Sequence, residues 1–493
     1  MRKLLLALIS LVLIGITGYF LIPIEPKTKK FGYSEALNAI PPKSSFILCS
    51  ENILDKWNFF SKSKIGNSLN QISSYSAIKA VFSKIDSIQD ESILAFLNQK
   101  VFIAGVLTSG NQLNQIVAFE SKGASIEQVQ TCLKSLFSSD PLSSKEYENY
   151  KIDVYDLKGI EVSFAHVDNV ILFSTSSILI EEGIRELSAE VHLTDEPGFK
   201  KILKTADFQS DGNFFINFNQ IGGCLNLYGN KKNDFTKSFN QFGGWAELDL
   251  NSRDESWMLN GFSFISDSTS SYLNSFSGEK AQALNVISVL PENTGVFKYI
   301  SFTDFQTYKN KYNQYLSQQQ VLYHHKKNLQ NINKKHSFNV ENDFYSWIGD
   351  EISLFTVSGD EKSFEKNSGL IIKIKDLQKA KESLKRIHES TGTHNEVEYQ
   401  TLLIDDLGLT NFFPLALGTE FKTISGSKYI LIEDYIIFAN DESVLKHIVN
   451  FYLRGKTLVK NIQFNQFYKQ FSGESNLFYY YNFQLAQNFF GSY

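Results

Sequence analysis

Two similar stretches, 250 positions apart, divide this chain: Ile40-Pro41-Pro42-Lys43-Ser44 and Leu290-Pro291-Glu292-Asn293-Thr294. Each has an apolar residue, a proline, two polar or turn-forming residues and a residue with a hydroxyl group. Proline and short polar residues are typical of turns. Each stretch leads into a strand-like run, at residues 45–49 and 295–299. We predict that each marks the start of one copy of a duplicated domain.

Segments further along the chain keep nearly the same spacing, as expected for a repeat. The matched pairs are 97–101 with 348–352 and 126–136 with 377–387, both 251 positions apart, then 170–173 with 435–438 and Phe199 with Phe464, both 265 apart, and 213–217 with 476–480, 263 apart. The step from 251 to 265 predicts an insertion of about 14 residues in the second copy. We place it near residues 412–418.

Strand-like runs alternate with helical patterns along both copies, without the regular period of βαβ units. This order favours an α+β fold in which a largely antiparallel sheet carries packed helices. We place the first module at residues 36–275 and the second at 283–493. The first module ends in a predicted hairpin at residues 244–264, which the second lacks. Either the second copy lacks these strands, leaving an open sheet edge, or the chain is a fragment of a longer one.

The composition of the 493 residues sets limits on the class of protein. The 42 Phe and 23 Tyr favour strands, and the net charge of −5 argues against a nucleic-acid partner. Three well-separated cysteines, Cys49, Cys132 and Cys224, form neither a disulfide framework nor a CxxC motif. We expect them to be buried, inert thiols.

The N-terminus carries an uncharged stretch at residues 4–24, after Arg2 and Lys3. As a helix it would be about 31 Å long, which is enough to cross a bilayer core. It is longer than the apolar part of a signal peptide and is not followed by small residues. We predict a transmembrane anchor at residues 1–25 and a linker at 26–35, with a cleaved signal as the alternative. The bulk of the chain is expected outside the cytoplasm.

One region differs between the copies. A long helix is predicted over residues 304–332, opened by a capping box of Thr303 and Gln306. Phe305, Tyr308, Tyr312, Tyr315, Leu322 and Leu329 follow a three- and four-residue spacing, in which Gln319 and Lys326 interrupt the apolar stripe. The helix either packs on its own sheet or offers this stripe to a protein partner.

No standard catalytic, cofactor or metal motif is present, so we predict no site residues of these kinds. GxSxG, GxxxxGK[ST] and GxGxxG are all missing. His324 and His325 are adjacent on a helix and point in different directions, and the other histidines show no ligand spacing: His166, His192, His336, His388, His394 and His447. The adjacent carboxylates are poor acid–base pairs because neighbours in a strand face opposite sides: Glu181-Glu182, Asp254-Glu255 and Asp405-Asp406.

Two smaller patterns have structural interpretations. Gly222-Gly223 and Gly243-Gly244 are expected in loops or at strand edges. The aromatic run at residues 478–483 could be a stacking surface for sugars, but its matched segment is a strand predicted to be buried, so core packing is favoured.

An N-terminal anchor followed by an α+β module that opens with Leu-Pro-x-x-Thr resembles a family of bacterial envelope proteins known only as a domain of unknown function. Residues 290–294 fit this pattern directly, and residues 40–44 fit it with Ile for Leu and Ser for Thr. The resemblance covers most of residues 36–493. It implies an anchored, non-cytoplasmic protein and supplies no catalytic residues.

These observations favour an envelope-anchored, non-catalytic protein that serves binding or scaffolding. The alternative is an envelope hydrolase acting on a polymer, which would need two carboxylates facing one cleft.

Overall fold

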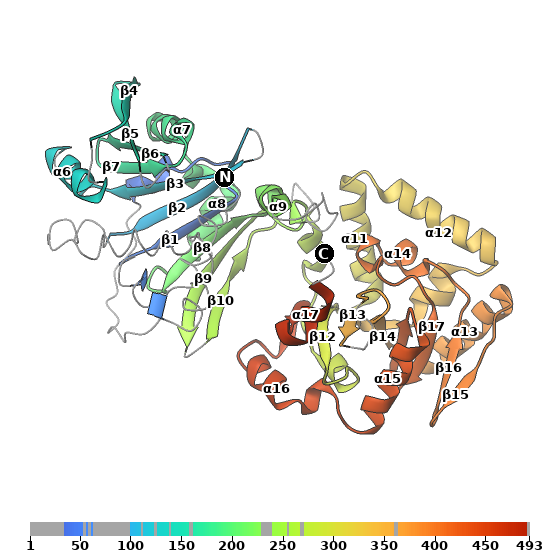
Figure 1. The fold of residues 1–493 in the computed structure, drawn as a ribbon. Coiled ribbons are helices and arrows are strands. Elements are labelled where there is room, and N and C mark those ends of the chain that lie inside the picture. Colours follow the sequence, from blue (N-terminus) through green and yellow to red (C-terminus); the bar gives the residue numbers. More distant parts are fainter. Residues whose placement is uncertain are drawn as a thin grey trace. The chain divides into compact units, whose positions relative to one another are not determined.

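The computed structural model describes residues 34–52, 56–57, 61–62, 99–109, 112–122, 126–137, 140–156, 161–227, 239–253, 256–266, 271–358 and 363–490. The chain divides into two compact units, Met1–Ser271 and Tyr272–Tyr493. Each unit combines a large antiparallel sheet with helices (Figure 1). This mixed architecture agrees with the predicted fold class.

The described part of the first unit contains a ten-stranded sheet in which every neighbouring pair is antiparallel. In spatial order the strands are β10 (Ser256–Ser263), β9 (Trp245–Arg253), β8 (Gly212–Asn217), β1 (Phe46–Ser50), β2 (Val101–Thr108), β3 (Gln112–Glu120), β7 (Val170–Ser174), β6 (Glu161–Val167), β5 (Tyr150–Asp156) and β4 (Ser143–Tyr147). The predicted hairpin at 244–264 is therefore the β9–β10 pair.

Alternation along each strand gives this sheet two apolar faces. On β1, Ile47 and Cys49 belong to a core cluster on one face, whereas Phe46 and Leu48 belong to a cluster on the other. The first face is covered by η1 (Glu35–Ala39), α7 (Ser177–Ser188), η3 (Leu193–Asp195) and α8 (Pro197–Leu203). The second is covered by α6 (Ile126–Phe137) and α9 (Phe218–Asn226). The sheet is thus the middle of three layers.

The described part of the second unit contains an eight-stranded antiparallel sheet. In spatial order it consists of β20 (Leu477–Tyr481), β12 (Thr294–Ser301), β13 (Ile348–Val357), β14 (Ser368–Ile374), β18 (Tyr435–Ala439), β17 (Lys428–Ile432), β16 (Leu402–Asp406) and β15 (Val397–Tyr399). A separate pair joins β11 (Gln282–Ala283) to β19 (Glu474–Ser475).

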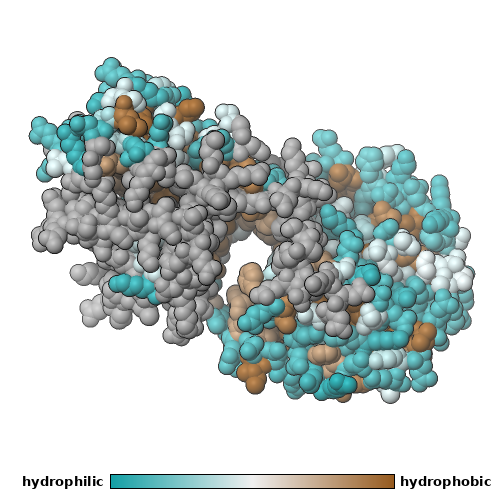
Figure 2. All heavy atoms as spheres, in the orientation of Figure 1, coloured by the Kyte–Doolittle hydropathy of each residue, from teal (hydrophilic) through white to brown (hydrophobic). Residues whose placement is uncertain are grey.

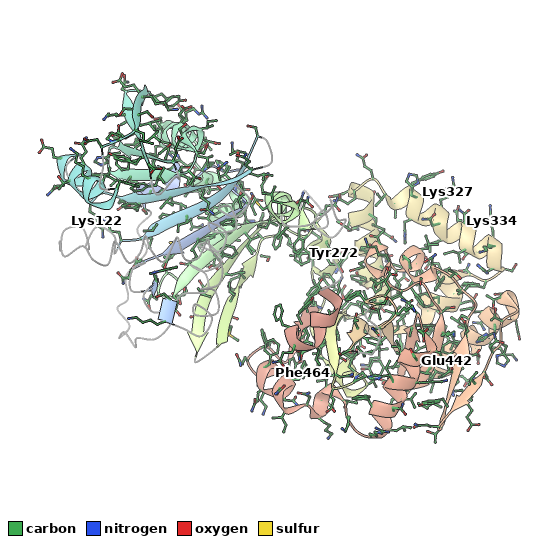
Figure 3. All side chains as sticks on the ribbon, in the orientation of Figure 1. Lys122, Tyr272, Lys327, Lys334, Glu442 and Phe464 are labelled. Carbon is green, nitrogen blue, oxygen red and sulfur yellow. The ribbon has the colours of Figure 1, made fainter. Side chains whose placement is uncertain are left out.

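Helices cover both faces of this sheet as well. One core cluster joins the sheet to η5 (Asn285–Ser288), α15 (Glu442–Leu453), η9 (Leu458–Lys460) and α16 (Ile462–Tyr468). Within it, Phe464 of α16 packs against Phe297 and Tyr480 (Figure 3). The remaining helical elements are η4 (Tyr272–Phe276), α11 (Phe305–Gln318), α12 (Leu322–His336), η6 (Val340–Phe344), η7 (Tyr345–Trp347), α13 (Leu377–Thr391), α14 (Phe412–Ala416), η8 (Thr419–Phe421) and α17 (Phe483–Phe490).

The order β20-β12-β13-β14-β18-β17-β16-β15 repeats the order β8-β1-β2-β3-β7-β6-β5-β4 of the first unit. The pairing registers repeat too: Phe46 lies opposite Ile216, and Val296 lies opposite Tyr481. Ile216 and Tyr481 are 265 positions apart, so the last strand keeps the spacing of the strands before it. The predicted spacing of 263 for this strand was wrong by two residues.

The predicted insertion lies between β16 and β17. Asp153 of β5 and Asp405 of β16 occupy the same place in their sheets, opposite Phe164 and Tyr429 respectively. The connection from Asp405 to Tyr429 spans 24 positions, whereas that from Asp153 to Phe164 spans 11. The additional residues include α14, at the place where the spacing predicted an insertion.

Both opening stretches form the same buried turn. The Ser44 hydroxyl donates to the Pro41 carbonyl at 2.6 Å, and the Thr294 hydroxyl donates to the Pro291 carbonyl at 2.7 Å. In each turn the backbone N–H of the hydroxyl residue donates to the same carbonyl. Ser44 and Thr294 are both fully buried.

The predicted long helix is broken in two. Gln320, with φ of 60°, separates α11 from α12 because a left-handed residue cannot continue a helix. Asp304, not Thr303, is the N-cap: its carboxylate accepts a hydrogen bond from the Thr307 N–H at 3.0 Å. The predicted capping box was therefore wrong by one residue.

Other boundaries also differ from the prediction. Tyr272–Ser275 were predicted to lie in the first module but belong to the second unit, where Tyr272, labelled in Figure 3, packs against Tyr312. Gly222-Gly223 lie inside α9, not in a loop. The predicted anchor and the predicted linker up to residue 33 lie outside the described residues. No helix in the described ranges is both long and apolar enough to span a bilayer.

Replacing Thr294 with Val removes the turn hydroxyl with little change in shape. The Pro291 carbonyl then loses a partner in a site that water does not reach, so we expect the free energy of unfolding to fall by about 1 kcal/mol. Urea denaturation followed by circular dichroism measures the change. Thr294→Ser keeps the hydroxyl and should stay close to the wild type; an equal loss in both variants would contradict the role of this hydrogen bond.

Candidate functional site

Three features of the described residues carry unusual chemistry: a buried carboxyl group in the first unit, a histidine–aspartate cluster in the second, and an open sheet edge at β20. From the sequence we predicted no catalytic, cofactor-binding or metal-binding residue at any of these three places. Each is built from residues on different elements.

The buried carboxyl group belongs to Glu247 on β9. Its side chain is fully buried. Burial, together with the neighbouring Asp249 carboxylate two residues along the same strand, raises the pKa of Glu247 to about 8. Asn213 on β8 donates to Asp249 Oδ1 at 2.7 Å and lies 3.4 Å from Glu247 Oε1. Glu247 is therefore protonated at neutral pH, and its burial keeps it from contact with a substrate.

The histidine–aspartate cluster lies at the end of α13 and the start of the β15–β16 hairpin. His388 is in the last turn of α13, which Gly392 ends by adopting a left-handed conformation with φ of 68°. The chain then turns back past His394, and β16 brings in Asp405. His388 and Asp405 are buried, whereas the side chain of His394 is 63% exposed.

Asp405 Oδ2 is the centre of this cluster. It lies 3.0 Å from His388 Nε2 and 3.2 Å from His394 Nδ1. Its other oxygen, Oδ1, accepts hydrogen bonds from the Asn395 N–H at 3.0 Å and the Asp406 N–H at 2.7 Å. The Tyr429 hydroxyl on β17 lies 3.0 Å from His388 Nε2. The two histidines are six positions apart, which is no standard ligand spacing, and Asp405 is a further 11 away, so sequence inspection missed the cluster.

The described residues of the first unit include the equivalent aspartate but form no such cluster around it. Asp153 is equivalent to Asp405 and is also buried, but it pairs with Lys151 at 2.8 Å and accepts from Ser144. By the spacing of 251 positions between α6 and α13, the counterpart of His388 is Phe137. The fold thus accommodates a buried aspartate here without histidines.

The open edge belongs to β20. In the first unit β8 pairs with β1 on one side and β9 on the other. Its equivalent β20 pairs with β12, and no strand within the described ranges pairs with its other side. Asn482 N–H donates to Gly295 O and Ser301 N–H donates to Asn476 O. Since backbone bonds alternate in direction along an antiparallel strand, those of Leu477 and Tyr479 point to the outer side of β20, away from β12.

Apolar side chains remain exposed beside this edge. Phe467 of α16 and Phe471 just after it are 41% and 43% exposed. At the position equivalent to Phe467, Ile202 of the first unit is 2% exposed, and α8 packs there against β9 through Phe199 and Trp245. Figure 2 shows hydrophobic residues on the surface where Figure 1 draws α16.

The aromatic run at 478–483 is only partly core. Tyr480 is buried and Phe478 is partly buried, whereas Tyr479, Tyr481 and Phe483 are 58%, 37% and 76% exposed. The prediction that the whole run is core was therefore wrong for every second residue of the strand. The cause is that the matched strand β8 has a neighbour on both sides.

Several predicted residues occupy ordinary structural positions. Cys49 and Cys224 are buried, and burial raises the pKa of the Cys49 thiol to about 12, in line with inert thiols; the side chain of Cys132 is not among those described. Glu181 and Glu182 lie on α7 and pair with Lys145 and Lys43.

Within the part of the chain that the structure describes, the remaining histidines and acidic pairs form no further cluster of possible metal ligands. The structure places the other histidines on different elements: His166 on β6, His192 before η3, His324, His325 and His336 on α12, and His447 on α15. Asp405 and Asp406 lie at the end of β16, and Asp254-Glu255 fall outside the described residues.

The apolar residues predicted at 304–332 pack inside the second unit where they lie on α11. Tyr312 packs on Tyr272, Phe305 packs on Tyr345, and Leu316 is buried. On α12, by contrast, Tyr323 is 70% exposed, and Ile332 is the buried residue of the helix. A partner contact through this region stays a prediction.

Comparison with protein families gives one match. Residues 258–492 match the model of a family described as "Protein of unknown function (DUF3352)". This range covers most of β10 and almost all of the second unit, which is therefore a domain of unknown function. Neither the curated proteins nor the solved structures gave a match.

Glu247 makes the stability of the first unit depend on pH. Its folded pKa of about 8 lies above the ordinary value of 4.5, so its contribution to stability is complete below pH 4.5 and is lost as the pH rises toward 8. Glu247→Gln should therefore raise the free energy of unfolding at pH 8, by an amount on the order of 2 kcal/mol, and change little at pH 4.

Thermal unfolding of wild type and variant across this pH range tests the expectation. Glu146→Gln, at an exposed position on β4, is the matched control and should change stability equally at both ends of the range. A Glu247→Gln variant that is less stable than the wild type at pH 8 would show that the buried group is not held as the neutral acid.

Proposed function

We propose that the protein is a membrane-anchored, non-catalytic binding protein made of two related modules, and that it binds an extended segment of a partner at the edge of β20. The observation that carries the proposal is the difference between two equivalent edges. β8 is covered by the β9–β10 hairpin, whereas the outer side of β20 has no strand among the described residues.

A strand edge is a binding surface because its unpaired N–H and C=O groups can bond to an added strand. On the outer side of β20 the backbone groups of Leu477 and Tyr479 face this way. The first unit indicates which orientation fits, since β9 runs antiparallel to β8. An antiparallel segment at β20 would likewise continue the sheet.

The exposed residues of α16 indicate the chemistry of the partner. In the first unit the ring of Trp245, on β9, packs against the ring of Phe199, on α8, with the ring centroids 4.9 Å apart. Phe464 is the counterpart of Phe199, and Phe467 and Phe471 lie exposed beside it. A bound segment with apolar or aromatic side chains facing α16 would cover these rings and remove about 25 cal/mol per Å² of apolar surface from water. The partner is therefore a protein with an apolar, extended segment.

The anchor rests on the sequence. Residues 4–24 are uncharged and long enough to cross a bilayer, and the Leu-Pro-x-x-Thr pattern resembles bacterial envelope proteins. This supports a single-pass protein with both units on the extracytoplasmic side.

The geometry of the buried acids supports a role without catalysis. Glu351, on β13, is 1% exposed and accepts hydrogen bonds from the Val286 N–H, the Tyr435 hydroxyl and the Lys373 ammonium. Glu247 is likewise buried. A polymer hydrolase would instead need carboxylates that face a cleft.

Strand binding is testable with a peptide of residues 244–264, the hairpin that covers β8. Added to the full chain, a fluorescent form of this peptide should bind, and Tyr481→Lys should weaken the binding at least about tenfold, because a charge on an edge strand opposes pairing. Fluorescence anisotropy measures both affinities.

The matched control is Leu403→Lys on β16, another exposed apolar residue of the same sheet, which should leave the affinity unchanged. Equal affinities of the wild type and Tyr481→Lys, or no binding at all, would refute edge recognition at β20. Self-association of the chain that Tyr481→Lys abolishes, without peptide binding, would identify a second copy as the occupant instead.

The anchor has its own experiment. After expression in a bacterium and cell fractionation, the full chain should sediment with membranes and resist an alkaline wash, whereas a chain without residues 4–24 should stay soluble because its apolar span is gone. Recovery of the full chain in the soluble fraction would disprove the anchor.

A further inference from the structure

We propose that His388, His394 and Asp405 form a binding site for a divalent transition-metal ion of the zinc type. The ligand atoms are His388 Nε2, His394 Nδ1 and Asp405 Oδ2, which all lie within 4.8 Å of one another. This site is separate from the β20 edge and does not depend on the function proposed above.

The spacing of the three atoms suits a tetrahedral ion. Zinc binds imidazole nitrogen and carboxylate oxygen at about 2.0–2.2 Å, which puts neighbouring ligand atoms about 3.3–3.6 Å apart. The two nitrogens lie 3.0 and 3.2 Å from Asp405 Oδ2. Shifts of a few tenths of an ångström would therefore bring both nitrogen–oxygen distances into the range of a zinc site.

The orientation of the His388 ring presents its Nε2 atom to Asp405 and so to a metal ion. Its Nδ1 hydrogen-bonds the Thr393 carbonyl, which can only accept, so Nδ1 carries the proton. In neutral His388 the Nε2 atom then has a lone pair, and it faces the Asp405 carboxylate at 3.0 Å. Two acceptors in contact repel each other, and a metal ion between Nε2 and Oδ2 would remove this repulsion. The Tyr429 hydroxyl, 3.0 Å from Nε2, is another group that can meet this lone pair.

The surroundings of the ligands match those of known metal sites in two respects. A metal-binding histidine usually donates its other N–H to a carbonyl or carboxylate, as His388 does to Thr393. The ligating carboxylate is usually held by further hydrogen bonds, as Asp405 Oδ1 is by the N–H groups of Asn395 and Asp406. Oδ2 remains for the ion.

Comparison with the first unit shows that the fold itself does not require histidines at this place. There the equivalent Asp153 pairs with Lys151 and Ser144, and Phe137 stands in the place of His388. The ring of Phe137 stacks on that of Tyr155. A sheet of the same order thus forms without imidazoles, so the two histidines are an addition specific to the second unit.

The ligand set selects the class of ion. Imidazole nitrogen suits zinc, copper, iron and nickel, whereas calcium and magnesium prefer oxygen ligands throughout. Three protein ligands leave one tetrahedral position for water or a further donor. The exposed His394 side chain gives the ion access from solvent. Glu396 Oε1 lies 3.9 Å from His394 Nε2, on the outer side.

Calorimetric titration with zinc chloride tests the proposal on the full chain after treatment with a chelator and dialysis. We expect one zinc ion bound per chain, and we expect His394→Ala to weaken binding at least about tenfold. His394 is the preferred variant because its exposed side chain can be removed without opening the core. His324→Ala, at an exposed position on α12, is the control and should bind zinc as the wild type does.

A second measurement uses cobalt(II) in place of zinc. Nitrogen and oxygen ligands in a tetrahedral arrangement give cobalt(II) an intense visible absorption band, which should appear with the wild type and vanish with His394→Ala. Absence of one-to-one zinc binding, or zinc affinity unchanged in His394→Ala, would overturn the proposal and leave the cluster as a contact between two histidines and an aspartate without a metal ion.

Discussion

The hydrogen bond from a buried hydroxyl to a proline carbonyl, made by Ser44 in one unit and Thr294 in the other, sets the start of each sheet. The strand that follows it lies between two neighbours: β1 between β2 and β8, and β12 between β13 and β20. Both neighbours come from later parts of the chain. Because buried backbone groups must all be paired, an error in this turn would shift the register of a strand on which two others depend.

The two units share the central strands of their sheets and differ in the connections and at the sheet edges. The second unit has α14 and η8 between β16 and β17, two histidines beside the buried aspartate of β16, and an edge at β20 that no described strand covers. These differences lie in connections and edges, where the packing of the core sets few limits. They are also the places to which we assign binding.

Repeat spacing was a sound guide to the order of elements and to the site of the insertion, because strands and helices of one fold keep similar lengths. It failed by two residues at β20. The run from Phe478 to Phe483 is aromatic at five of its six positions, so a slip of two leaves the same type of side chain on each face. The long helix failed for a different reason: no residue in the pattern marked the left-handed conformation of Gln320.

By itself the sequence determined the two opening turns, the α+β class and the repeated order of strands, since these depend on local preference and on periodic burial. Only the tertiary structure brought His388, His394 and Asp405 together and showed that no described strand pairs with the outer side of β20. Both features arise from pairing between distant segments: β16 carries Asp405 to the end of α13, and β20 takes its place beside β12. The two hydroxyl turns could be predicted from local sequence, whereas the proposed sites form only when distant segments pack together.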